Sequence, residues 1–72
     1  MAHREHRRAL GGNLRTYRER AGLTQEKLAE KAELSPKFLG EVERGTVNVS
    51  VDVLARLAHA LKIPVNDLTR GF

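Results

Sequence analysis

The chain has 72 residues and a formal net charge of +4, from 13 lysines and arginines and nine acidic residues. This length allows one domain with a small core that buries only about 60% of the unfolded chain's surface, and the absence of cysteine excludes disulfides and thiolate metal sites and fits a reducing compartment. No apolar run approaches the roughly 18 residues of a membrane span, and no signal peptide is evident, so we expect a cytoplasmic protein.

The excess positive charge lies at the start of the chain. Residues 1–23 carry six arginines and two glutamates, whereas residues 24–72 carry seven basic and seven acidic groups. We predict residues 1–8 to be a basic arm or the frayed or early start of a helix, and residues 9–72 to be a single domain. A basic segment attracts phosphate without regard to sequence, although a solvated helix face would carry the same charge.

The first helix of the domain is predicted to begin within residues 7–12 and to run through Ala21. Its apolar face consists of residues at helical spacing, namely Leu10, Leu14, Tyr17 and Ala21. Gly11 and Gly12 weaken its start, because each glycine inside a helix costs about 1 kcal/mol relative to alanine. Gly22 is suited to end it.

Residues 23–45 are typical of two short helices joined by a tight turn. Thr24 and Ser35 have side-chain oxygens that can accept a free backbone N–H at a helix start, and Pro36 fits the first helical position. Gly45 is suited to end the second helix. The inward faces of the two helices carry Leu28, Ala29 and Ala32 in the first, and Leu39 and Val42 in the second.

The outward side of the second of these helices is predicted to be a polar stripe. Residues at positions i, i+3, i+4 and i+7 form it: Lys37, Gly40, Glu41 and Arg44. A buried helix followed by a helix with an exposed polar stripe suits insertion of that second helix into the major groove of DNA. Gly40 permits either a close approach to DNA or tight packing on the preceding helix.

The remaining residues predict two further helices after a loop at residues 46–49. Ser50 can cap the first of them, and its buried stripe is predicted to be Val51, Leu54, Leu57, Ala58 and Leu61. Residues 62–64 interrupt this helix, and a short last helix covers residues 65–69 with Leu68 pointing inward. The whole pattern predicts an all-α, compact five-helix domain.

The central stretch closely resembles the helix-turn-helix of the lambda-repressor-like (Xre/Cro-type) family of DNA-binding domains. The matching motifs are Leu23-Thr24-Gln25, Leu28-Ala29, Leu34-Ser35 and Val42-Glu43-Arg44-Gly45, and the resemblance extends over roughly residues 10–68. It implies sequence-specific binding of double-stranded DNA by a small transcriptional regulator, such as an autoregulator, a phage-type repressor, a restriction-modification control protein or an antitoxin. In one departure, the family usually has glycine in the turn where this chain has Glu33.

Lys37 and Glu41 are the best candidates for reading bases, because lysine can donate to guanine and glutamate can accept from cytosine. They could also pair with each other, since they lie four residues apart on one helix. We expect Pro36 and Phe38 to lie beside them at the bases, although Phe38 could equally fill the core. The resemblance places Gln25 at a DNA phosphate.

Further phosphate contacts are expected at the start of the second helix and just past its end, from Ser35, Arg44, Thr46 and Asn48. The resemblance also implies a structural ion pair between Arg18 and Glu43. A partly buried pair of this kind fixes geometry more than it adds stability.

We expect a homodimer on a palindromic operator, because such domains commonly bind two half-sites about one helical turn apart. The predicted interface consists of apolar residues that follow the core helices: Val65, Leu68 and Phe72. The rival interpretation is a protein-interaction module with the same fold. The polar stripe argues against it, because protein hot spots prefer aromatic and apolar anchors.

An enzyme is disfavoured by the residues that the chain lacks. It has no cysteine, no Ser-His-Asp spacing that a helical hairpin could assemble, and no phosphate-binding glycine loop. His3 and His6 can share a helix face, but no third ligand is near them in the sequence. We therefore expect no metal, cofactor or small-molecule ligand.

Overall fold

The computed structural model describes residues 2–72, and it describes side chains from residue 5 onward. It has five helices, which are α1 (Ala2–Arg20), α2 (Gln25–Ala32), α3 (Pro36–Arg44), α4 (Val51–Leu61) and α5 (Val65–Leu68). The predicted all-α, five-helix class is confirmed. No helix in the described residues is long and apolar enough to cross a membrane. The side chain of His3 lies outside the described part, and so does its predicted proximity to His6.

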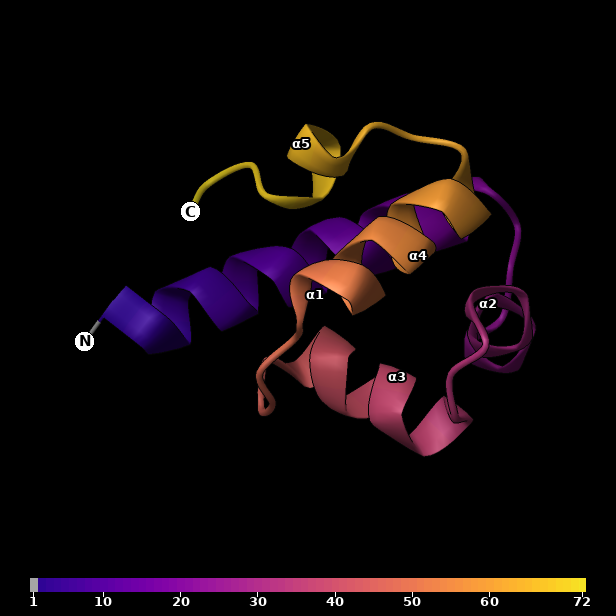
Figure 1. Cartoon of the computed structure of the whole chain (residues 1–72), viewed down its shortest axis with the longest axis horizontal. Helices are drawn as coiled ribbons and strands as arrows, with labels where there is room; N and C mark the ends of the chain where they lie inside the picture. The colour runs from indigo at the N-terminus through magenta and orange to yellow at the C-terminus, as the bar shows by residue number, and fades with distance from the viewer. Residues whose placement is uncertain (1) are drawn as a thin grey trace.

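The long helix α1 is the element on which the others assemble. It packs against α3 on one side and α5 on another, while α2 packs against α3 and α4 (Figure 1). The start of α1 and the C-terminal tail lie at the same end of the molecule (Figure 1). The Asn13 side chain joins the middle of α1 to the end of α5 and the tail, because its Nδ2 donates to the carbonyl oxygens of Leu68 at 2.9 Å and Arg70 at 2.8 Å.

Helix α1 begins at Ala2, earlier than the start predicted within residues 7–12. Of the alternatives given for residues 1–8, this is the early start of the helix. Gly11 does not weaken a helix end, because it lies in the interior of α1 and is buried where α1 meets the end of α3. A Cβ at this position would lie 2.4 Å from the carbonyl oxygen of Glu43. The close approach of the two backbones therefore requires glycine at Gly11, which offsets its low helix propensity. Gly22 follows the helix with φ of 72°, as its predicted role requires.

The core is a single cluster of aliphatic side chains from all five helices, comprising Leu10, Leu14, Leu28, Ala29, Ala32, Leu39, Val42, Leu57, Ala58, Leu61 and Leu68. The predicted inward faces of α2 and α3 are confirmed. In α4 the prediction was wrong for Val51, which is 81% exposed. Val51 stands at the first position of α4 and at the edge of its apolar stripe, so the packed part of the helix starts only later.

Side-chain caps fix where three of the helices begin. The hydroxyls of Thr24, Ser35 and Ser50 accept from the backbone N–H three residues later, at 3.0 to 3.1 Å. At the other end of α2, Glu33 adopts the left-handed conformation with φ of 59°. Arg56 of α4 then reaches across and donates to the carbonyl oxygens of Ala32 at 3.0 Å and Glu33 at 2.6 Å. These bonds satisfy the free carbonyls at the end of α2.

Candidate nucleic-acid interface

The unit of α2, the turn and α3 presents one side of α3 to solvent. Lys37 and Arg44 are exposed and Glu41 is half-buried, while Leu39 and Val42 are in the core. No ion pair joins Lys37 to Glu41 in the described part of the chain. The free ends of these two side chains are therefore available to an outside partner.

Gly40 lines the same hollow as Lys37 and Arg44, as its place in the predicted stripe requires, but it is buried. A Cβ there would lie 3.2 Å from Nη1 of Arg44 and 3.8 Å from Oε1 of Gln25. The side chain of Arg44 folds back over this position, and α2 lies beside it. The nearest neighbours of such a Cβ are the ends of flexible side chains, so no close packing of the α2 and α3 backbones requires glycine here.

Phe38 lies half-buried at the rim of the core and packs against it. The ring therefore helps to hold α3 in place, and the rest of its surface faces solvent. Pro36 and Ser35, at the start of the helix, are exposed.

A buried ion pair fixes α3 to the body of the domain. Nε of Arg18 lies 2.6 Å from Oε2 of Glu43 and its Nη2 lies 3.2 Å from Oε1, while its Nη1 donates to the carbonyl oxygen of Leu23 at 2.9 Å. The two side chains are only 12% and 5% exposed. The hydrogen bond that Arg18 donates to Glu43 raises the pKa of Arg18 above its ordinary value, so the guanidinium stays charged.

Gln25 belongs to the same network, which sequence reasoning did not foresee. Its Nε2 donates to Oε1 of Glu43 at 2.9 Å. Helices α1, α2 and α3 thus meet at one carboxylate, and Gln25 sits at the N-terminus of α2 with a fixed amide. An amide nitrogen has two N–H groups, and Glu43 uses one of them.

Two hollows flank the outward side of α3, and Arg44 lines both. The first lies between the start of α2 and α3, and its lining includes Thr24, Gln25, Pro36, Lys37 and Arg44. The second lies at the other end of α3 and is lined by Arg7, Arg8, Arg44, Gly45 and Thr46. Sequence analysis named Arg44 and Thr46 but neither arginine of α1. Its only signal for them was the basic character of residues 1–23.

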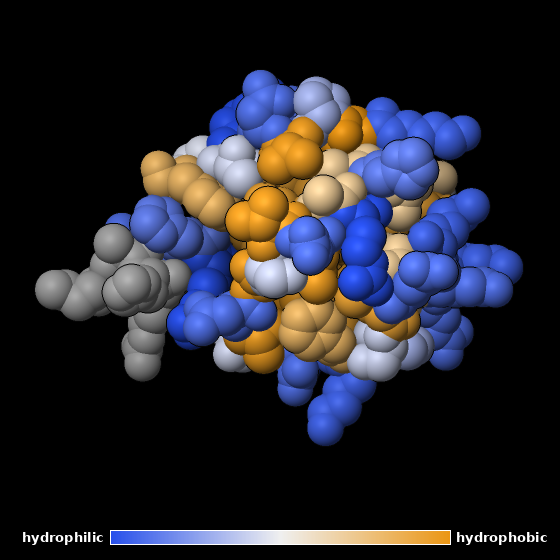
Figure 2. All heavy atoms as spheres, in the orientation of Figure 1, coloured by the Kyte–Doolittle hydropathy of each residue, from blue (hydrophilic) through white to orange (hydrophobic). Residues whose placement is uncertain are grey.

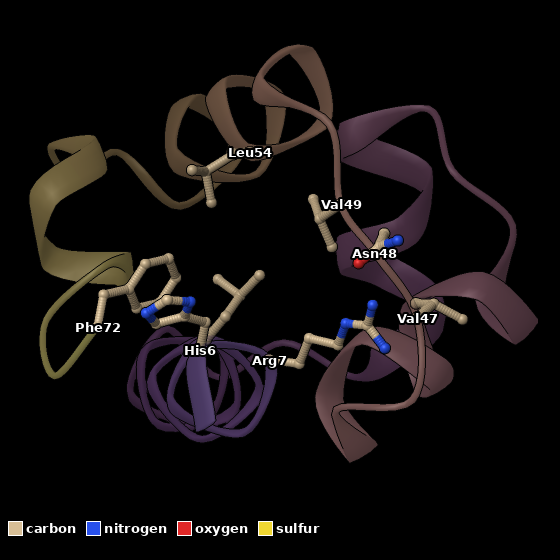
Figure 3. Close-up of a pocket in the computed structure, with 8 residues that line it drawn as sticks. His6, Arg7, Val47, Asn48, Val49, Leu54 and Phe72 are labelled. Carbon is tan, nitrogen blue, oxygen red and sulfur yellow. The ribbon is translucent and has the colours of Figure 1, made fainter. Parts of the chain in front are cut away.

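The expected contact residue Asn48 does not line either of these hollows. It borders a third one, together with Val47, Val49, Leu54, His6 and Phe72 (Figure 3). The rings of His6 and Phe72 lie 5.2 Å apart at one wall, and Arg7 extends from α1 toward the loop of Val47 and Asn48 (Figure 3). Five apolar residues and three polar or charged ones line this third hollow.

Apolar surface extends from this hollow over α5 and the start of α4 (Figure 2). Its most exposed large residues are Val51 at 81%, Phe72 at 52% and Val65 at 41%. Leu68, which was predicted to lie at a dimer interface, is 0% exposed and belongs to the core. That part of the prediction was wrong, because Leu68 is the residue through which α5 closes the core.

The comparisons with known proteins fit this geometry. Residues 9–70 match a family described as a helix-turn-helix domain. Control protein C.SmaI of Serratia marcescens is 42% identical over 59 residues, covering 82% of this chain and 70% of that protein. The chain spans only 38% to 45% of the length of several curated relatives described as HTH-type transcriptional regulators.

Two solved structures are also similar. The clp gene regulator ClgR from Corynebacterium glutamicum is 45% identical, with a TM-score of 0.83 over 86% of this chain and 66% of that chain. The restriction-modification controller protein C.AhdI from Aeromonas hydrophila is 40% identical, with a TM-score of 0.84 over 86% of this chain and 94% of that chain.

Proposed function

The chain belongs to the helix-turn-helix domain family of transcriptional regulators, and from this premise we propose that it binds double-stranded DNA sequence-specifically through α3. The observation that carries the proposal is the outward side of α3, where Lys37 and Arg44 stand exposed between two hollows. The helix is held from behind by the Arg18–Glu43 pair and by its core residues. Direct readout in a major groove requires a helix whose position is fixed and whose exposed polar side chains are free to bond to bases.

The middle of this surface and its two ends have different proposed roles. Lys37 and Glu41 read base edges, with Pro36 and Phe38 beside them, because these side chains stand on the outward side or rim of α3. Gln25 and Ser35 bind phosphates at the starts of α2 and α3, where helix N-termini favour anions. Arg44, Thr46 and Asn48 bind phosphates past the other end of α3.

The regulator is further proposed to act as a homodimer on a palindromic site. The support is the exposed apolar surface of Val51, Val65 and Phe72. Leu68 is buried and is no longer part of the proposed interface, whereas the exposed Val51 is added to it. The neighbouring hollow has a volume of about 160 Å³. Cavities of roughly this size hold a benzene molecule, so the hollow has room for an apolar side chain of a second copy.

Selection of bound sites from random duplex DNA tests the DNA-binding proposal. We expect one enriched sequence, with two related half-sites if the dimer forms, and an affinity that falls by roughly 0.9 log units per phosphate contact for each decade of salt. A flat salt response, or no binding to any duplex at low salt, would falsify DNA binding. Enrichment of a single half-site would reject the palindrome alone.

A further inference from the structure

The backbone of α1 at Arg7 and Arg8 packs on the end of α3. A Cβ on Gly45 would lie 3.2 Å from both the Cα and the N of Arg8. Gly45 has φ of 75° and ends α3, so this contact joins α1 to the point where α3 stops. Arg7 and Arg8 consequently have fixed positions relative to Arg44 and Thr46.

These residues line a hollow that has three arginines and no acidic residue in its lining. The guanidinium of Arg44 lies over Gly40, one turn back along α3. Within the described residues, none of the three forms an ion pair, whereas Arg15, Arg18 and Arg70 each have a carboxylate partner. Arg8 and Arg44 are exposed. The Nε of Arg7 is covered and has no hydrogen-bond partner among the described groups. The cluster therefore concentrates positive charge that the folded chain does not compensate.

The position of the cluster identifies the anion. Helix α3 has nine residues, so it is about 13 Å long at 1.5 Å per residue. The major groove of B-DNA is about 12 Å wide. With the start of α2 at one end of α3 and the arginine cluster at the other, a helix lying in the groove would have a positive site toward each bordering backbone.

We propose that Arg7 and Arg8 form, with Arg44, a phosphate-binding site for the DNA backbone at the C-terminal end of α3. Guanidinium groups suit this ligand, because their planar forks can donate two parallel hydrogen bonds to phosphate oxygens. The inference rests on the proposed DNA binding and adds to it two residues of α1. In this proposal Arg7 and Arg8 contact a particular phosphate, in contrast to a general attraction between positive charge and DNA.

The test compares Arg8→Ala with Arg15→Ala on the selected DNA site over a range of salt concentrations. Both variants remove one positive charge from an exposed position of α1, but Arg15 lies away from the cluster and pairs with Glu19. We expect Arg8→Ala to reduce the salt slope by about 0.9 for each copy bound to the site, and to weaken binding roughly five- to tenfold per copy near 0.1 M salt. Arg15→Ala should leave the slope unchanged.

Phosphate ethylation interference locates the contact. On the parent protein, ethylation of a phosphate beside the end of α3 should block binding, and Arg8→Ala should lose sensitivity at that phosphate alone. In an Arg44→Ala background, Arg8→Ala should have a smaller effect, because the two side chains share one ligand. Urea denaturation of each variant checks that its fold is intact.

Equal changes in slope for both variants would overturn the inference in favour of general charge attraction. An unchanged slope for Arg8→Ala, with tight binding by the parent, would overturn it and leave the proposed function standing. Failure of the parent to bind any duplex would overturn both.

Discussion

Gly11 and Gly12 are neighbours on α1, yet their surroundings differ completely. A Cβ at Gly11 would collide with backbone atoms of Val42 and Glu43, at 2.7 and 2.4 Å, whereas a Cβ at Gly12 would meet nothing within 4 Å. Backbone atoms cannot give way as a flexible side chain can. The two positions therefore form a matched pair, in which the same substitution has opposite consequences.

We expect Gly11→Ala to destabilise the domain by about 3 kcal/mol or more, because α1 and α3 must separate. Gly12→Ala should instead stabilise it by up to about 1 kcal/mol through helix propensity. The free energy of unfolding from urea titration measures both. Similar effects from the two substitutions would show that the close approach at Gly11 is not required.

A second prediction at this scale concerns Glu33, which has a φ of 59° and therefore takes the left-handed conformation in the turn after α2. Glu33→Gly should stabilise the domain by about 0.5–1 kcal/mol, because glycine adopts this conformation without the steric cost of a Cβ. Lys62, with φ of 58°, is a second site where the same exchange should act in the same direction. A loss of stability at Glu33 in urea denaturation would contradict the prediction.

At the scale of elements, the parts predicted well were those that local sequence determines. Thr24, Ser35 and Gly45 act at the helix ends where they were expected, because a cap depends only on residues three or four positions away. The apolar spacing of α2 and α3 likewise identified their buried sides. Arg18 and Glu43 pair as the family resemblance implied.

The parts that were missed depend on partners distant in the sequence. The bond of Arg56 to Ala32 spans 24 residues, and the contact of Gly45 with Arg8 joins different helices. No spacing pattern reports which helix crosses which, so neither contact had a signal in the sequence. The same limit explains Val51, because a stripe of apolar residues does not tell how far along α4 the core extends.

A third prediction follows from the different proposed roles of α3, which reads bases, and of the residues that bind phosphates. Lys37→Ala should cost about 1–3 kcal/mol on the specific site and relax the choice at one base pair, most simply a guanine. Glu41→Ala should relax one other position. Gln25→Ala and Asn48→Ala should weaken all sequences about equally, because phosphate contacts carry no sequence information.

The measurement compares the DNA sequences that each variant selects with those that the parent protein selects. Gln25→Ala also removes a hydrogen bond to Glu43, so its stability must be measured in parallel. The assignment of α3 to the groove fails if Lys37→Ala leaves the profile unchanged while Gln25→Ala reshapes it.

For the whole molecule, the apolar surface over α5 and the start of α4 predicts self-association. Val51→Glu and Phe72→Ala should each shift the protein from dimer toward monomer in sedimentation at micromolar concentration. Val51→Glu puts a charge in place of an apolar side chain that the interface would bury, and Phe72→Ala removes apolar area from it. Ala21→Glu is the control, since it adds one negative charge just past the C-terminal end of α1. Ala21 is exposed there, so its predicted place on the apolar face was wrong. A parent protein that is monomeric both alone and on DNA would reject the dimer.

The bonds from Arg56 to the end of α2 have a consequence for the DNA sequences that the proposed dimer could use. They connect α4, at the proposed interface, directly to the unit that carries α3. Two copies joined through α4 would therefore hold their α3 helices at a fixed separation and a fixed relative rotation. One inserted base pair moves a half-site by about 3.4 Å and turns it by about 34°. Operators with altered spacers should consequently be bound by one copy at a time, even when both half-sites are intact.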